Sequence, residues 1–83
     1  MENVVNLVET EILKSGEVKL YCSTFSTLGL AQKYLEVRIE QLKSEELQVI
    51  FDKNNVVVLQ NDNVYTKLQL FNNEIDFWNK YIL

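Results

Sequence analysis

Histidine and proline are absent from the 83 residues, and the chain holds only one cysteine and two glycines. Without histidine there can be no imidazole metal ligand, no histidine-based catalytic triad and no histidine pH switch. The single cysteine, Cys22, excludes a disulfide within the chain and a cysteine-ligated zinc site. We therefore expect neither a metal nor another cofactor.

Long apolar runs and clustered basic residues are also missing. No apolar run approaches the roughly 20 residues of a membrane span, and residues 1–5 lack the basic start of a signal peptide. The net charge is −4, from 12 acidic and 8 basic residues, and the basic residues are scattered singly. Because phosphate neutralisation needs clustered Lys and Arg, we expect no direct nucleic-acid binding. With a lone thiol, the expected compartment is a reducing cytoplasm.

Apolar residues are plentiful, at 47 % of the chain. That proportion is sufficient for a packed core and argues against disorder. The length corresponds to a single domain over residues 1–83. A chain of this size is expected to be stable by only a few kcal/mol.

Strand patterns dominate both ends of the sequence. Residues 3–13 are rich in β-branched side chains, and the alternating run from Val18 to Cys22 follows a turn around Gly16, which predicts a hairpin. A helix over residues 3–14 ending before Gly16 is the alternative. Three further strands are predicted at 47–51, 56–60 and 64–71. The turns between them, at 52–55 and 61–63, are rich in Asn and Asp, which tolerate left-handed backbone.

The clearest single element is a helix from about Thr27 to Ser44, with Ser26 as its cap. One apolar stripe should pack on a sheet, and it consists of Leu28, Ala31, Leu35, Ile39 and Leu42. A short terminal helix is predicted after Asn72 or Asn73. The order is ββαβββα, an α+β fold in which an antiparallel meander of four to five strands carries the long helix on one face.

Strand alternation divides the sheet into two faces. We expect the face under the helix to include Val18, Leu20, Cys22, Leu47, Val49, Phe51, Val56, Val58, Val64, Leu68 and Leu70. The other face should carry Tyr21, Ile50, Val57, Leu59, Tyr65 and Phe71, mixed with Lys and Gln. For the strand at 56–59 the assignment depends on register, because a slip of one residue exchanges its faces.

The stretch from Phe25 to Glu36 reads Phe-Ser-Thr-Leu-Gly-Leu-Ala-Gln-Lys-Tyr-Leu-Glu. It resembles a pattern in small proteins of Gram-positive bacteria and their phages, in which a strand ends in Phe-Ser-Thr and a helix with Ala-x-x-Tyr-Leu-Glu follows. Gly29 departs from that pattern, since Glu is frequent there, and the capping box is lost. The resemblance implies a hairpin, a helix and then two or three strands. It also implies a phage or mobile-element accessory protein, which would act in the host cytoplasm, and it implies no catalytic residues.

Candidate catalytic and metal-binding groups all have simpler explanations. The nearest carboxylate pairs, Glu45–Glu46 and Glu9/Glu11, are expected to be solvated, because so small a chain offers no deep cleft between two carboxyl groups. The Asn- and Asp-rich turns lack the spacing and the glycine of a calcium loop. Cys22 alternates with apolar residues on a strand, so we expect a buried, inert thiol. The chain is therefore predicted not to be an enzyme.

More apolar surface is present than two helices and one small sheet can cover. A second helical arc of Leu30, Tyr34 and Val37 lies beside the packing stripe, and Tyr21 and Tyr65 fall among Lys and Gln. Large exposed apolar patches usually mark partner sites, so we predict that these five residues bind a protein partner. The leading hypothesis is a phage-type inhibitor that blocks a host nuclease or defence effector, with a homodimer as a compatible feature. The acidic charge would steer it toward a basic, nucleic-acid-binding surface of that target.

Two other classes of function remain open. The same apolar surface could make a structural, self-assembling homodimer without a separate target. The third class is a sponge for a small ligand or nucleotide, with a site formed between subunits.

Overall fold

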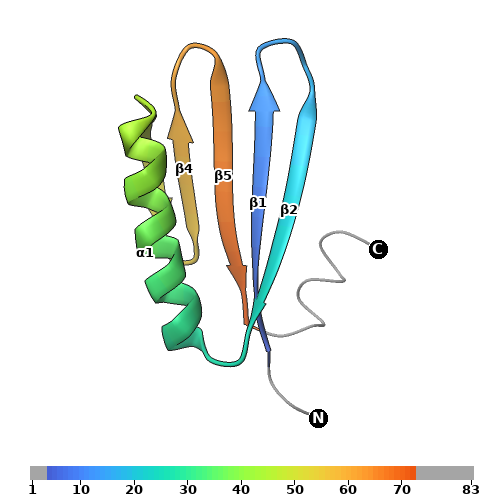
Figure 1. The fold of residues 1–83 in the computed structure, drawn as a ribbon, viewed down its shortest axis with the longest axis vertical. Coiled ribbons are helices and arrows are strands. Elements are labelled where there is room, and N and C mark those ends of the chain that lie inside the picture. Colours follow the sequence, from blue (N-terminus) through green and yellow to red (C-terminus); the bar gives the residue numbers. More distant parts are fainter. Residues whose placement is uncertain (1–3, 73–83) are drawn as a thin grey trace.

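The computed structural model describes residues 4–72 (Figure 1). The elements are, in chain order, β1 (Val5–Leu13), β2 (Val18–Phe25), α1 (Leu28–Ser44), β3 (Gln48–Lys53), β4 (Val56–Gln60) and β5 (Val64–Phe71). The α+β class and the order of the first six predicted elements are confirmed, and the helical alternative for the first segment is excluded. The predicted C-terminal helix lies outside the described residues.

The five strands form one antiparallel sheet in the order β2-β1-β5-β4-β3. A simple meander was therefore the wrong prediction, because β1 pairs with β5 and the chain crosses the sheet between β2 and β3. The 17-residue helix α1 belongs to the connection that makes this crossing. In Figure 1, α1 runs along the strands rather than across them, beside β4 on that side of the sheet, and it leaves β5, β1 and β2 largely uncovered.

The predicted turns form through the residues that suggested them. Gly16 adopts φ +93, donates from its N–H to the Leu13 carbonyl (2.8 Å), and the Leu13 N–H donates to the Glu17 carbonyl (2.9 Å). These are the bonds of a three-residue hairpin loop with glycine in the left-handed position. At the β4–β5 turn, Asn61 Oδ1 accepts from the backbone N–H groups of Asn63 and Val64, at 2.8 Å each. A side-chain oxygen thus holds the turn in place.

Both ends of α1 are capped. The cap is Thr27 rather than the predicted Ser26, and its side chain accepts from the Leu30 N–H at 3.2 Å. At the other end the N–H of Glu46 donates to the Lys43 carbonyl, and the N–H of Leu47 donates to the Leu42 carbonyl. This pair of bonds is a Schellman motif, and buried Leu42 and Leu47 supply its apolar contact.

The core lies between α1 and the central strands. Its buried members are Val5, Leu7, Ala31, Leu42, Leu47, Val57, Leu59, Leu68 and Leu70, with Phe25, Leu35, Ile39 and Val64 packed against them. The helical stripe is thus confirmed except at Leu28, which is exposed.

The predicted faces of β2 and β4 are wrong. Residues directly opposite in antiparallel strands share a face, and buried Leu68 lies opposite both Glu9 and Val57. Tyr21 lies opposite Glu9, so Tyr21 and Val57 are on the helix face. Val18, Leu20 and Cys22 of β2 are on the far face. Phe51 of β3, also predicted for the helix face, lies opposite Val58 on the far face. The alternating pattern of β2 indicated two faces, but it did not determine which face packs against the helix.

Candidate functional site

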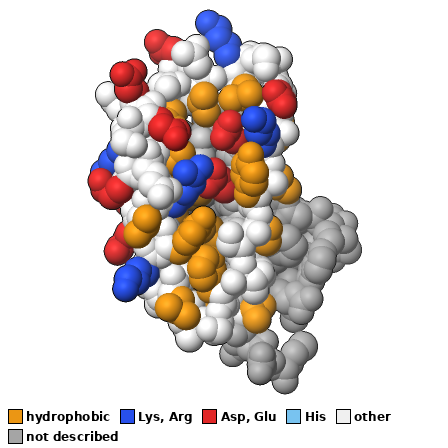
Figure 2. All heavy atoms as spheres, in the orientation of Figure 1, with side chains coloured by type: hydrophobic (Ala, Val, Ile, Leu, Met, Phe, Trp, Pro, Cys, Tyr) orange, Lys and Arg blue, Asp and Glu red, His pale blue; other side chains and the backbone are white. Residues whose placement is uncertain are grey.

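An open groove lies between α1 and the β1–β2 hairpin, with a volume of about 540 Å³. It forms because α1 covers the β4 side of the sheet and leaves the helix face of β2 open (Figure 1). The residues that line it include Leu7, Glu9 and Glu11 from β1, Tyr21 and Ser23 from β2, and Tyr34 and Arg38 from α1. On this face, Figure 2 shows hydrophobic side chains interspersed with acidic and basic ones.

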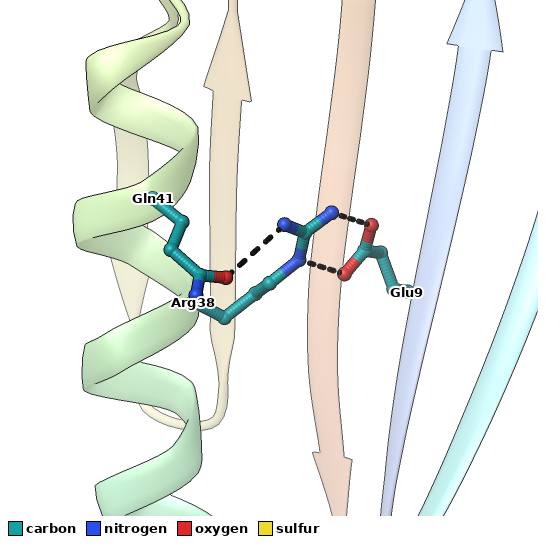
Figure 3. Close-up of polar contacts among 3 residues, drawn as sticks. All are labelled: Glu9, Arg38 and Gln41. Atoms are coloured by element: carbon teal, nitrogen blue, oxygen red, sulfur yellow. Dashed lines mark hydrogen bonds and ion pairs between the residues drawn. The ribbon is translucent and has the colours of Figure 1, made fainter.

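An ion pair forms the centre of the groove. Arg38 Nε and an Arg38 terminal nitrogen donate to the two carboxylate oxygens of Glu9, each at 2.8 Å (Figure 3). Its other terminal nitrogen donates to Gln41 Oε1 at 3.4 Å. Glu9 is only 7 % exposed, and its hydrogen bonds raise the pKa of Arg38 above the ordinary value. A two-point contact of this kind fixes both side chains, so the groove has a rigid polar floor.

Two of the predicted partner-binding residues meet at this groove. Tyr21 is 53 % exposed and Tyr34 is 44 % exposed. The Tyr34 ring also contacts Phe25, with 5.3 Å between centroids and 45° between planes. Leu30 and Val37, each about half exposed, lie on α1 four residues before and three residues after Tyr34. They extend the exposed apolar stripe along the helix.

Tyr65 is not brought to this surface. It lies opposite Ile12 in β1, on the far face of the sheet, and it is half-buried. The five predicted residues therefore divide into four on the helix side and one on the opposite side. That they contact a partner stays a prediction.

Cys22 is exposed, so the prediction of a buried thiol was wrong. It sits on an edge strand, where the far-face side chains have a neighbour on one side only. Partial desolvation nevertheless raises the pKa of the Cys22 thiol. The expected lack of reactivity of this thiol stays a prediction.

Sequence reasoning missed Arg38 as the partner of Glu9, although a signal for it was present. Arg38 is the one arginine of the chain, and it falls between Leu35 and Leu42 on the packing side of the helix. A charged residue at such a position needs a partner on the surface beneath it. The partner could not be identified from sequence, because the register and face of β1 were unknown.

The described residues also bear on metal binding, on membrane-spanning helices and on the predicted solvated carboxylates. Among residues 4–72 no group of three or more Cys, Asp or Glu side chains is placed to hold a metal ion. Within the same residues, no helix is long and apolar enough to cross a membrane. Glu45 and Glu46 are both exposed, as expected of solvated carboxylates. The same prediction for Glu9 was wrong, because Glu9 is buried and paired with Arg38.

In comparisons with known proteins, no family model, no curated protein and no solved structure matches this chain.

Proposed function

We propose that this chain is a non-enzymatic protein-binding module whose site is the groove between α1 and the β1–β2 hairpin. One observation carries the proposal: Tyr21 and Tyr34 stand half exposed on either side of the Glu9–Arg38 ion pair. Exposed tyrosines around a rigid polar centre are typical of interfaces, where aromatic residues supply much of the binding energy.

The exposed stripe on α1 enlarges this surface. Leu30 and Val37 continue the apolar contact beyond Tyr34, and Glu36 and Glu40 stand exposed beside Val37. Lys33 is exposed one turn before Val37, and Glu40 is 3.6 Å from Lys43, so charges of both signs border the strip. The narrower hypothesis, a phage-type inhibitor of a host nuclease or defence effector, rests on the sequence resemblance and on the net charge of −4, which favours a basic target.

Site-specific photocrosslinking in a lysate of the host tests the proposal. A benzophenone amino acid at Tyr34 should crosslink to one discrete partner. The same group at Gln32, which is exposed on the opposite side of α1, should not. With that partner purified, Tyr34→Ala should weaken binding by about tenfold or more, whereas Tyr34→Phe keeps the ring and most of the affinity.

Tyr65→Ala is the matched control, because Tyr65 is on the other face of the sheet. If Tyr65→Ala weakens binding as much as Tyr34→Ala, the groove is not the site. Equal crosslinking from Gln32 and Tyr34 would also contradict the proposal.

A further inference from the structure

Among residues 4–72, no strand pairs with the outer edge of β2. In the described sheet β2 bonds only to β1, and its side chains from Val18 to Cys22 are exposed. They include apolar groups on both faces, with Leu20 at 56 % and Tyr21 at 53 % exposure. An eight-residue edge strand with exposed apolar side chains is a template for another strand.

The free backbone groups of this edge can be assigned. The N–H of Leu13 donates to the Glu17 carbonyl in the turn to β2, and the N–H of Lys14 donates to the Asn63 carbonyl on the β5 side. Since alternate residues of a strand direct their bonds to opposite neighbours, odd-numbered residues of β1 bond to β2. Their partners in β2 are odd-numbered too, for example Tyr21 opposite Glu9. The outward N–H and C=O groups are therefore those of Val18, Leu20, Cys22 and Thr24.

The other edge of the described sheet is built differently. β3 is six residues long, its pairing with β4 is interrupted by a bulge between Val49 and Phe51, and it ends in Asp52 and Lys53. Bulges, charges and short length are the features that block edge pairing. The β1–β2 ladder runs from Val5 to Ile12 without a shift in register. The β2 edge can therefore accept another strand, whereas the β3 edge resists pairing. Two copies that pair through β2 leave no edge that can extend the assembly, so the expected product is a closed dimer rather than a filament.

We propose that a second copy of this chain pairs its β2 antiparallel with this edge, about a twofold axis at Tyr21. In that register Val18 lies opposite Thr24 of the second copy, and Leu20 lies opposite Cys22. The outward-pointing groups of one copy then face those of the other and form about eight hydrogen bonds. Lys19 lies opposite Ser23, so no like charges meet, and the two Tyr21 rings become close neighbours on the helix face.

A twofold axis at Cys22 fits less well. It would place Val18 opposite Ser26, which is outside β2, and Lys19 opposite the Phe25 ring. The Tyr21 register pairs the strand from Val18 to Thr24 completely and joins two five-stranded sheets into one. The β2–β2 interface does not involve the partner proposed for the groove. An experiment that contradicts one of the two proposals therefore leaves the other standing.

Sedimentation velocity on the purified chain, from about 1 μM to 1 mM, measures the association. A single strand pair is a small interface, and we expect a dissociation constant of about 1–100 μM. Leu20→Lys should weaken dimerisation by about tenfold or more, because the two new lysines lie diagonally across the axis. Ile50→Lys on the β3 edge is the matched control, since Ile50 is also 56 % exposed, and it should leave the dimer intact.

Disulfide trapping tests the register. In a Cys22→Ser background, Tyr21→Cys should give an oxidised dimer, because residues opposite at a non-hydrogen-bonded position have Cα atoms about 4.5 Å apart. Ser23→Cys in the same background should not form an intermolecular disulfide, because its two copies are offset along the strands. A chain that is monomeric at 1 mM, a dimer weakened equally by Ile50→Lys, or trapping at Ser23 but not at Tyr21 would overturn the proposal.

Discussion

Glu9 in β1 and Arg38 in α1 form a two-point ion pair at 2.8 Å for each bond, and the arginine side chain reaches across β5 to make it (Figure 3). The contact joins the helix to a central strand at a place where apolar packing ends and the open groove begins. A buried carboxylate there is stable only with its partner, since desolvating an unpaired charge is costly.

Arg38→Met should therefore lower the free energy of unfolding by about 2–3 kcal/mol, because it leaves Glu9 buried and unpaired. Adding Glu9→Leu should restore most of that loss, since the double variant holds no unpaired charge. Arg38→Lys should fall between wild type and Arg38→Met, because an ammonium cannot make the two-point contact. Urea unfolding followed by circular dichroism gives the free energy of unfolding of these chains and of Glu9→Leu alone, which completes the double-mutant cycle. Additive effects of the two substitutions would show that the pair is not coupled.

Glu46→Gly should stabilise the chain by about 0.5–1 kcal/mol. Glu46 closes the Schellman motif with φ 68, a left-handed conformation that glycine adopts without a Cβ penalty. The matched control is Glu45→Gly, whose φ is −91. At position 45, glycine would only increase the conformational entropy of the unfolded chain, so the free energy of unfolding should fall. Thermal melts of both variants test this prediction. A higher melting temperature for Glu45→Gly, or a lower one for Glu46→Gly, would contradict the assigned cap.

Alanine at the two glycines should have opposite effects. A Cβ at either position meets nothing within 4 Å, so only the backbone matters. Gly16 has φ +93, and Gly16→Ala should cost about 1 kcal/mol. Gly29 lies in the first turn of α1, and Gly29→Ala should add about 0.5–1 kcal/mol through helix propensity. Chemical denaturation of both variants checks the signs, and a stabilising Gly16→Ala would rule out the left-handed hairpin loop.

Cys22 should react completely with iodoacetamide in the folded chain, because it is exposed, but slowly near neutral pH. Its pKa is raised by desolvation, so the folded state holds less thiolate at a given pH than the unfolded state does. The alkylation rate should rise with pH, with a midpoint above that of the same thiol in urea. Measurements at a concentration well below about 1 μM keep association small. A folded midpoint equal to or below the unfolded one would contradict the desolvation.

The local features of this chain could be predicted from its sequence, because they depend on neighbouring residues. Gly16 and Asn61 formed the turns expected of them, and Ala31, Leu35, Ile39 and Leu42 met the core as their spacing indicated. The bounds of β4 and β5 agree with the predicted strands for the same reason.

Relations between distant segments were decided only by the tertiary structure. The sequences of β2 and β4 left two faces possible, and a one-residue choice decides which face meets a helix. The pairings of β2 with β1, β1 with β5 and β4 with β5 made that choice. These pairings also placed Glu9 beneath Arg38 and brought Tyr21 to the groove that Tyr34 lines. Periodicity reports the environment of each strand separately, whereas these contacts depend on which strands become neighbours, and that is a property of the whole packed sheet.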